Sequence, residues 1–145
     1  MQFQVTDAKT RCTCVAFSKD SVMCAAGYND GAIRTFELNQ VDLESKFVPH
    51  DCAVVQIMYS LDKKVIISGN TRGVIVVSSA TAGSTLRVLT DHKDNLLTTF
   101  DMAPLSTGSD REIMWLAGSA DRRITVRQLR RIVFFESARG VMTKK

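Results

Sequence analysis

The chain has 145 residues, of which 45% are hydrophobic and 23% are charged, a composition that suits one globular domain and excludes a disordered chain. It has no apolar run of the ~18–20 residues that cross a bilayer, and its first ten residues lack the basic and apolar regions of a secretory signal, so we expect an intracellular protein without a membrane partner. The four cysteines are then expected to be free thiols, and the net charge of +4 comes from residues 122–145, which hold eight Lys and Arg against one acid.

Short runs rich in β-branched and aromatic residues, separated by turn residues, follow one another along the chain. No segment before residue 127 keeps a 3.6-residue apolar period over three turns, so these runs predict strands and not helices. The sequence therefore predicts an all-β protein. The strands are expected at 13–17, 22–26, 32–36 and near 46–48, at 54–59, 65–68, 74–78 and 85–89, and at 96–100, 113–117 and 124–128.

The chain repeats itself at a fixed period. A shift of 42 residues places VAFSKDSVMCAAGYNDGAIRTFE (15–37) over IMYSLDKKVIISGNTRGVIVVSS (57–79). An aromatic residue and two glycines then coincide. These pairs are Phe17 with Tyr59, Gly27 with Gly69, and Gly31 with Gly73.

A third copy follows if an insertion is allowed. Phe100 takes the aromatic position, and WLAGSADRRITV (115–126) aligns with VIISGNTRGVIV (65–76). The extra residues fall in APLSTGSDRE (103–112), which is predicted to be a surface loop because it is rich in Pro, Ser, Gly and Asp. Three copies of about four strands, at a period of ~42 residues, match the blades of a WD-type β-propeller.

The copies resemble the WD-repeat family, whose repeats combine an early His, an aromatic-Ser-x-Asp turn, a Gly-Ser-x-Asp-Gly turn and a final Trp-Asp. The resemblance implies that a His, a Ser or Thr, an Asp and a Trp hold the strands of each blade together through buried hydrogen bonds. On this sequence it identifies His50, His92, Asp30 and Asp121 as residues of the blade hydrogen bonds, and Gly27, Gly31, Gly69, Gly73 and Gly118 as turn glycines.

The family pattern is eroded in every copy. The first copy has Asp30 but carries Ala8 at the His position, and the second has His50 but carries Arg72 at the Asp position. Only the third copy is expected to form the His–Asp pair, and both histidines are expected to be structural. No copy ends in Trp, because Phe36, Ser78 and Arg127 stand at that position.

These departures are informative in themselves. VVSS (76–79) and RVLTDH (87–92) resemble the corresponding stretches of one long WD-repeat protein of centrioles and cilia, and the similarity extends over residues 2–128. The resemblance implies an incomplete propeller of about three four-stranded antiparallel blades, which is a piece of a longer chain. The WD-repeat region then covers 1–128, with blades at about 6–48, 50–89 and 92–135, residues 1–5 as the last strand of a preceding blade, and a basic tail at 129–145.

The sequence of the tail leaves two questions open. Residues 132–135 fit either the missing fourth strand or a short amphipathic helix. The basic charge fits either salt-sensitive binding to an acidic polymer, such as nucleic acid or the acidic face of tubulin, or a solvated end. The lack of an aromatic stacking pattern favours the solvated end and argues against nucleic acid as a partner.

No motif for catalysis or for a cofactor is found. The NTRG turn (70–73) lacks the Gly-Lys-Ser/Thr ending of a phosphate loop. Cys12 and Cys14 are expected on one face of a strand, but a zinc site would also need Cys24 and Cys52 to lie close by, so packing thiols are the simpler interpretation. The two histidines have no triad context. No catalytic, cofactor or metal site is expected, and the chain is not predicted to be an enzyme.

A non-catalytic scaffold is the expected function, in which blades present loops and edges to other proteins. The resemblance implies the cytoskeleton of the centriole or cilium as the setting, with tubulin or other microtubule-wall components as partners, beside the remaining blades of a longer chain. The rival interpretation is a generic adaptor propeller that binds peptide motifs in signalling or ubiquitin-ligase complexes. Because three blades leave edges and an inner face uncovered, the chain alone is expected to be oligomeric or partly unfolded.

Overall fold

The computed structural model describes the backbone of residues 2–40, 43–103, 112–132, 135–137 and 142–144, and the side chains of 2–40, 45–103 and 113–129. Throughout these residues the regular elements are β-strands, and none is a helix long and apolar enough to cross a membrane. The strands are β1 (Cys12–Phe17), β2 (Met23–Tyr28), β3 (Ile33–Glu37), β4 (Leu43–Phe47), β5 (Val54–Tyr59), β6 (Val65–Asn70), β7 (Ile75–Ser79), β8 (Thr85–Leu89), β9 (Leu97–Met102), β10 (Glu112–Ser119), β11 (Ile124–Ile132), β12 (Phe135–Ser137) and β13 (Met142–Lys144).

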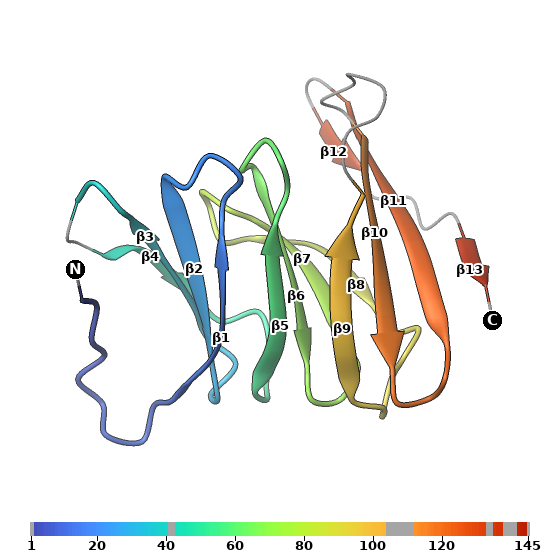
Figure 1. Ribbon diagram of the computed structural model, residues 1–145, viewed down its shortest axis with the longest axis horizontal. Helices are drawn as coiled ribbons and strands as arrows, with labels where there is room; N and C mark the ends of the chain where they lie inside the picture. The colour runs from blue at the N-terminus through green and yellow to red at the C-terminus, as the bar shows by residue number, and fades with distance from the viewer. Residues whose placement is uncertain (1, 41–42, 104–111, 133–134, 138–141, 145) are drawn as a thin grey trace.

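The strands form three antiparallel sheets, each built from neighbours in sequence (Figure 1). Blade 1 has the order β1-β2-β3-β4, blade 2 has β5-β6-β7-β8, and blade 3 has β9-β10-β11-β12. Every predicted strand overlaps one of these strands. The expected all-β fold with repeated antiparallel blades is therefore confirmed.

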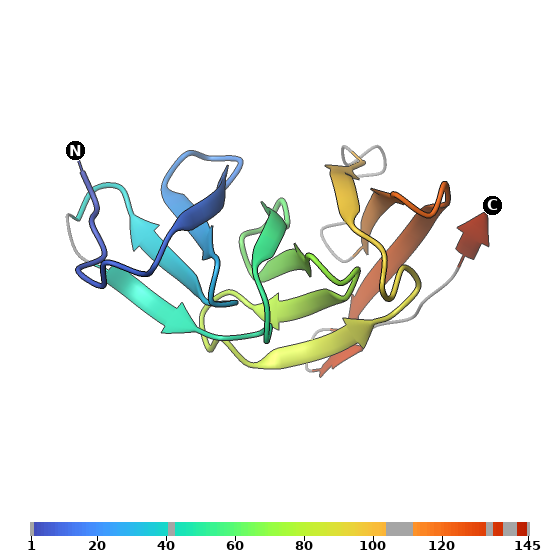
Figure 2. The ribbon, with the colours of Figure 1, turned by 90° about the horizontal axis from the view of Figure 1, so that it is seen from below.

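The three blades lie side by side along an open arc (Figure 2). The first strands β1, β5 and β9 lie toward the concave side of the arc, and β4 and β8 lie on its convex side. This is the arrangement of successive blades around the axis of a propeller, and within the described residues the arc does not close on itself.

The first hairpin of blades 1 and 2 is set by a Ser-x-Asp turn. The Ser18 hydroxyl donates to Asp20 Oδ1 at 2.7 Å and accepts the backbone N–H of Met23 at 3.0 Å. Ser60 and Asp62 repeat the contact at 2.7 Å in blade 2. The side chains thus satisfy backbone donors that the tight turn leaves unpaired, which fixes where each second strand begins.

A β-bulge near the start of the first strand recurs in blades 1 and 2, at Cys12/Cys14 and at Val54/Gln56. The bulge overturns the prediction that Cys12 and Cys14 share a face, because an extra residue breaks the alternation of side chains. Cys14 packs into the cluster with Val54 of blade 2, whereas Cys12 is exposed and lines a hollow on the opposite side with Tyr28.

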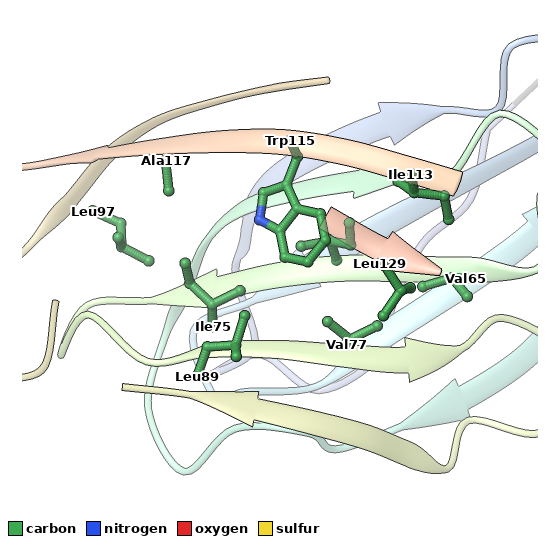
Figure 3. Close-up of a cluster of buried hydrophobic side chains, with 10 residues drawn as sticks. Val65, Ile75, Val77, Leu89, Leu97, Ile113, Trp115, Ala117 and Leu129 are labelled. Atoms are coloured by element: carbon green, nitrogen blue, oxygen red, sulfur yellow. The ribbon is translucent and has the colours of Figure 1, made fainter. Parts of the chain in front are cut away.

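The largest hydrophobic cluster lies between blades 2 and 3 (Figure 3). Trp115 points from β10 into this cluster, to which Ile75 and Leu89 of blade 2 also belong. A second cluster joins Ala25 and Ile33 of blade 1 to β5 and β6 of blade 2. Each blade therefore buries its apolar side chains against the next blade, and blade 2 is covered on both faces.

The C-terminal residues continue blade 3. β11 extends to Ile132, and both β12 and β13 pair with it as antiparallel strands. The described part of this segment therefore forms strands and not the alternative helix, whereas residues 133–134 of the predicted stretch 132–135 lie outside the described residues. The predicted surface loop at 103–112 falls largely on residues 104–111, which also lie outside them.

Residues 2–5, predicted as the last strand of a preceding blade, belong to no strand of the described chain. Their pairing partner would have to come from a further blade. Instead, the Phe3 ring packs against Phe36 of blade 1 with 4.3 Å between the ring centroids. Phe3 and Val5 thereby cover part of the outer surface of this blade.

Candidate functional site

The residues predicted to form the blade hydrogen bonds lie in the segments next to strand ends, and the densest group is in blade 3. His92 is fully buried and lies between Asp121 and Thr125. Its Nδ1–H donates to Asp121 Oδ2 at 2.9 Å, and its Nε2 lies 2.9 Å from the Thr125 hydroxyl. The third copy thus contains the contact between His92 and Asp121.

Two arginines extend this group. Arg123 donates to Asp121 Oδ2 at 3.1 Å and to the backbone oxygen of Asp91 at 3.1 Å. Arg127, which stands at the Trp position of the family pattern, donates through two nitrogens to the Asp91 carboxylate. A bidentate ion pair beside His92 therefore holds β11 to the segment before β9, and stands in this blade where a Trp contact would be expected.

The Asp121 carboxylate is held in its ionised form. Burial alone would raise the pKa of Asp121, but the hydrogen bond from His92 and the backbone N–H of Arg123 outweigh it and lower this pKa to about 2. Asp121 therefore stays charged through the neutral range, and this contact weakens only as the pH falls from about 4 toward 2.

In blade 2 neutral groups, an amide and a hydroxyl, hydrogen-bond the buried histidine. Asn70 Oδ1 accepts the backbone N–H groups of Arg72 and Val74, so its Nδ2 faces His50 and donates to Nδ1 at 3.1 Å. With Nδ1 accepting, the Nε2–H of His50 must donate to the Ser68 hydroxyl, 2.8 Å away. Asn70 thus makes the histidine contact that the family pattern assigns to the Asp position, where this blade carries Arg72.

Blade 1 lacks the histidine contact. Ala8 is exposed, and the partner of Asp30 among the described residues is the local backbone N–H of Ala32, at 3.0 Å. At the positions that correspond to Asn70 and Val76 of blade 2, this blade carries Tyr28 and Arg34. The Arg34 guanidinium stacks over the Tyr28 ring at 4.4 Å, so a cation–π contact takes the place of the hydrogen-bonded histidine.

The row Asp121–His92–Thr125 has the connectivity of a catalytic triad, but it cannot act as one here. Both His92 and Thr125 are at most 1% exposed, so no substrate carbonyl reaches the hydroxyl. In blade 2 the proton on His50 Nε2 points at Ser68, which prevents the imidazole from acting as a base toward that hydroxyl. The hydrogen-bonded groups around His92 and His50 therefore have a structural role, which is to hold the segment before each blade against its strands.

The predicted turn glycines fall into two classes. Gly31 and Gly73 lie in turns with φ of +88° and +79°, as expected. Gly27, Gly69 and Gly118 lie inside β2, β6 and β10, which corrects their prediction as turn residues. In β6 glycine is needed because the next blade lies close, since a Cβ on Gly69 would lie 2.4 Å from Leu97. In β2 a Cβ on Gly27 would lie 2.7 Å from Cys14 of the same blade and 2.8 Å from Val54 of the next.

The hydroxyl groups that complete the two histidine contacts were not predicted from the sequence. Ser68 lies on the second strand of blade 2, and Thr125 lies on the third strand of blade 3. The two positions are equivalent across the hairpin, because Ser68 faces Val76 and Ala117 faces Thr125. Only the strand register reveals this. The pair of Asp91 and Arg127, by contrast, had a signal in the sequence: an acid next to His92 and a cation at a position normally held by Trp.

This exchange of hydroxyl positions gives a testable expectation. Thr125→Val removes the partner of His92 Nε2 and is expected to lower the free energy of unfolding by about 1–3 kcal/mol. Ala117→Ser in that background places a hydroxyl where blade 2 has Ser68, and should restore at least half of the loss. Urea denaturation of the single and double variants measures both steps. If Ala117→Ser lowers the stability of Thr125→Val further, the proposed equivalence is wrong.

Within the described part of the chain, no group of three or more His, Cys, Asp and Glu side chains lies close enough to hold a metal ion. The four cysteines are free thiols in this structure. Burial raises the pKa of the Cys14 thiol, which makes it a weak nucleophile.

Comparison with known proteins identifies relatives of this blade series. The family described as WDR90, 4th beta-propeller matches residues 1–129. WD repeat-containing protein 90 of Xenopus tropicalis is 38% identical over 137 residues, and the human protein of that name is 33% identical over 143 residues. Each comparison covers 87% of this chain, which spans only 7% and 8% of the length of these two curated relatives.

A solved structure shares the fold. The β-propeller domain of Cps50 (Swd1) from Myceliophteria thermophila superposes on 85% of this chain with a TM-score of 0.68, at 14% sequence identity, and the match covers 36% of that domain. This likeness identifies the three sheets as consecutive blades of a β-propeller. Together with the match over residues 1–129, it shows that the chain belongs to the WDR90 fourth β-propeller family.

Proposed function

We propose that the chain is a non-catalytic scaffold segment of the centriole or cilium, which takes part in organising the microtubule wall by binding tubulin or another protein of that wall. The observation that carries the proposal is the match of residues 1–129 to the WDR90 fourth propeller. WD-type propellers generally act by presenting rigid surfaces to other proteins. The centriolar setting rests on the resemblance of the VVSS and RVLTDH stretches, and it goes beyond what the fold establishes.

The chemistry of the blades supports a binding role over a catalytic one. The histidines, acids and hydroxyls of blades 2 and 3 satisfy one another inside the sheets. This leaves loops and strand edges as the surfaces through which a partner is recognised. Residues 122–145 hold eight Lys and Arg, of which Arg123 and Arg127 are paired with Asp121 and Asp91 in blade 3. The other basic residues of this range suit an acidic partner such as tubulin.

A co-sedimentation experiment with taxane-stabilised microtubules tests the proposed partner. The complete chain is expected to pellet with microtubules at low salt, and less so as salt rises, because contacts between exposed charges are screened. A variant with Arg139, Lys144 and Lys145 changed to Gln should pellet less. A matched variant with Lys9, Lys19 and Lys93 changed to Gln loses the same charge elsewhere and should pellet like the parent chain.

Imaging tests the proposed location. The tagged chain, expressed in ciliated cells, is expected to concentrate at centrioles or the ciliary base. A chain that stays in the supernatant and spreads evenly through the cell would contradict the proposal and favour an adaptor propeller that binds peptide motifs.

A further inference from the structure

Two blade faces of this chain expose apolar side chains at positions that are buried elsewhere in the same chain. The first is the N-terminal blade face of blade 1, made by Val15, Phe17, Cys24, Ala26 and Tyr28, of which Val15 and Phe17 are exposed, Cys24 is partly exposed, and Ala26 and Tyr28 are buried. The second is the C-terminal blade face, made by Met114, Leu116, Gly118, Ile124 and Val126 of blade 3. Cross-strand pairing puts each set on one side of its sheet.

The repeat shows how these positions behave when a neighbour is present. On the N-terminal blade face Phe17 is 68% exposed, whereas the equivalent Tyr59 of blade 2 is 6% exposed because it packs against blade 1. Phe3 and Val5 cover the outer part of this face near Phe36 and leave the inner strand open. A hollow remains on this face, lined by Val15, Phe17 and Leu38 among others.

The C-terminal blade face shows the same contrast. Leu116 is 38% exposed and Ile124 is 56% exposed. Gly118 pairs with Ile124 as Gly69 pairs with Ile75, so the strand register shifts the sequence alignment of the third copy by one residue and makes Ile67 and Ile75 the equivalents of Leu116 and Ile124. Both are at most 1% exposed because they pack against blade 3.

Gly118 adds a steric argument for the same face. A Cβ on Gly69 would collide with Leu97 and Phe100 of the next blade, whereas around Gly118 only Thr98 and Thr99 of its own blade come within 4 Å. Blade 3 therefore retains, at Gly118, the glycine that blades 1 and 2 use for close approach of a following blade. No described residue of this chain occupies that space.

We propose that these two faces bind each other between copies of the chain, with the C-terminal blade face of one copy against the N-terminal blade face of a second copy. Such a contact would continue an interface that the chain already builds twice, between blades 1 and 2 and between blades 2 and 3. The contact is heterologous, so each copy keeps one free face of each kind until a ring closes or the assembly grows further. The apolar surface exposed at both faces supplies the driving force.

Charge substitutions on one face at a time test the proposal. Phe17→Glu blocks the N-terminal blade face and Leu116→Glu blocks the C-terminal one; both side chains are exposed in the single chain, so neither change disturbs its core. Sedimentation velocity over a range of concentrations should show that the parent chain assembles and that each variant stays monomeric. Val88→Glu, an exposed apolar position on β8 outside both faces, is the matched control and should assemble like the parent chain.

Mixing the two blocked variants is the decisive step. Each variant keeps the face that the other has lost, so an equimolar mixture should form a particle of two chains and no larger, since both remaining faces carry Glu. Circular dichroism checks that both variants keep the strand signal of the parent chain. A parent chain that is monomeric at every concentration, single variants that still assemble, or a mixture that stays monomeric would each overturn the proposal.

Discussion

Replacement of Gly73 by alanine is expected to lower the free energy of unfolding by about 3 kcal/mol or more. Gly73 has φ of +79°, and a Cβ at this position would lie 1.8 Å from the backbone oxygen of His92 and 2.5 Å from that of Asn95. Backbone atoms cannot rotate aside as a flexible side chain does. The segment that carries His92 would have to shift, and this would also strain its contacts with Asp121 and Thr125.

The equivalent turn of blade 3 separates the two causes of this loss. Arg122 stands at the corresponding position with φ of 67°, so a residue with a side chain does adopt this backbone conformation where no further blade of the described chain lies against the turn. The overlap with the next blade, more than the dihedral angle, therefore makes glycine necessary at 73. Arg122→Ala is the matched control and should change the stability by no more than about 0.5 kcal/mol. Chemical denaturation followed by tryptophan fluorescence measures both variants; a similar loss in each would contradict this explanation.

The stability of the chain is expected to fall by up to about 3 kcal/mol as the pH is lowered from 7 to 4, because of His50. Burial lowers the pKa of His50 from 6.5 to about 4, and the nearby Asp51 only partly offsets this effect. Between these two values the unfolded chain binds a proton that the folded chain does not. Stability is therefore full above pH 6.5 and declines as the pH drops toward 4.

A variant isolates this contribution from other titrating groups. His50→Asn removes the imidazole, so its stability should depend less on pH between 6.5 and 4, even if its stability at pH 7 is lower. Asp51→Asn changes only a neighbouring charge and should keep or slightly steepen the dependence of the parent chain. Urea denaturation at several pH values gives the curves, and NMR titration of the His50 ring should give a pKa near 4. Parallel curves for the parent chain and His50→Asn would show that His50 is not responsible.

The repeat made most of the fold predictable from the sequence. Because glycines, aromatic residues and Ser-x-Asp turns recur at one period, strands at 54–59 and 85–89 were predicted at their observed bounds. The contact of His92 with Asp121 followed from the same alignment. Strands and turns that recur in the sequence could be predicted because each copy must hydrogen-bond the same backbone groups and bury the same side of its sheet.

Features that depend on strand register or on a neighbouring blade were not predictable in this way. A bulge moved Cys12 away from the face of Cys14, and alternation of side chains gives no sign of it. The family acid is missing at Arg72, and Asn70, two residues earlier, takes its place. Its amide oxygen accepts backbone N–H groups of the turn as a carboxylate would. The reason for Gly69 lies in Leu97 and Phe100, which are distant in sequence and approach only when the blades pack.

The central structural claim is that each blade is held by close packing on the next, through the glycine on its second strand. The most direct test compares the free energies of unfolding of Gly69→Ala and Gly118→Ala, measured on the monomer at low concentration. Gly69 faces blade 3, whereas Gly118 has only exposed threonines of its own blade nearby. We predict that Gly69→Ala loses about 2 kcal/mol more than Gly118→Ala. Equal losses at the two positions would contradict the claim.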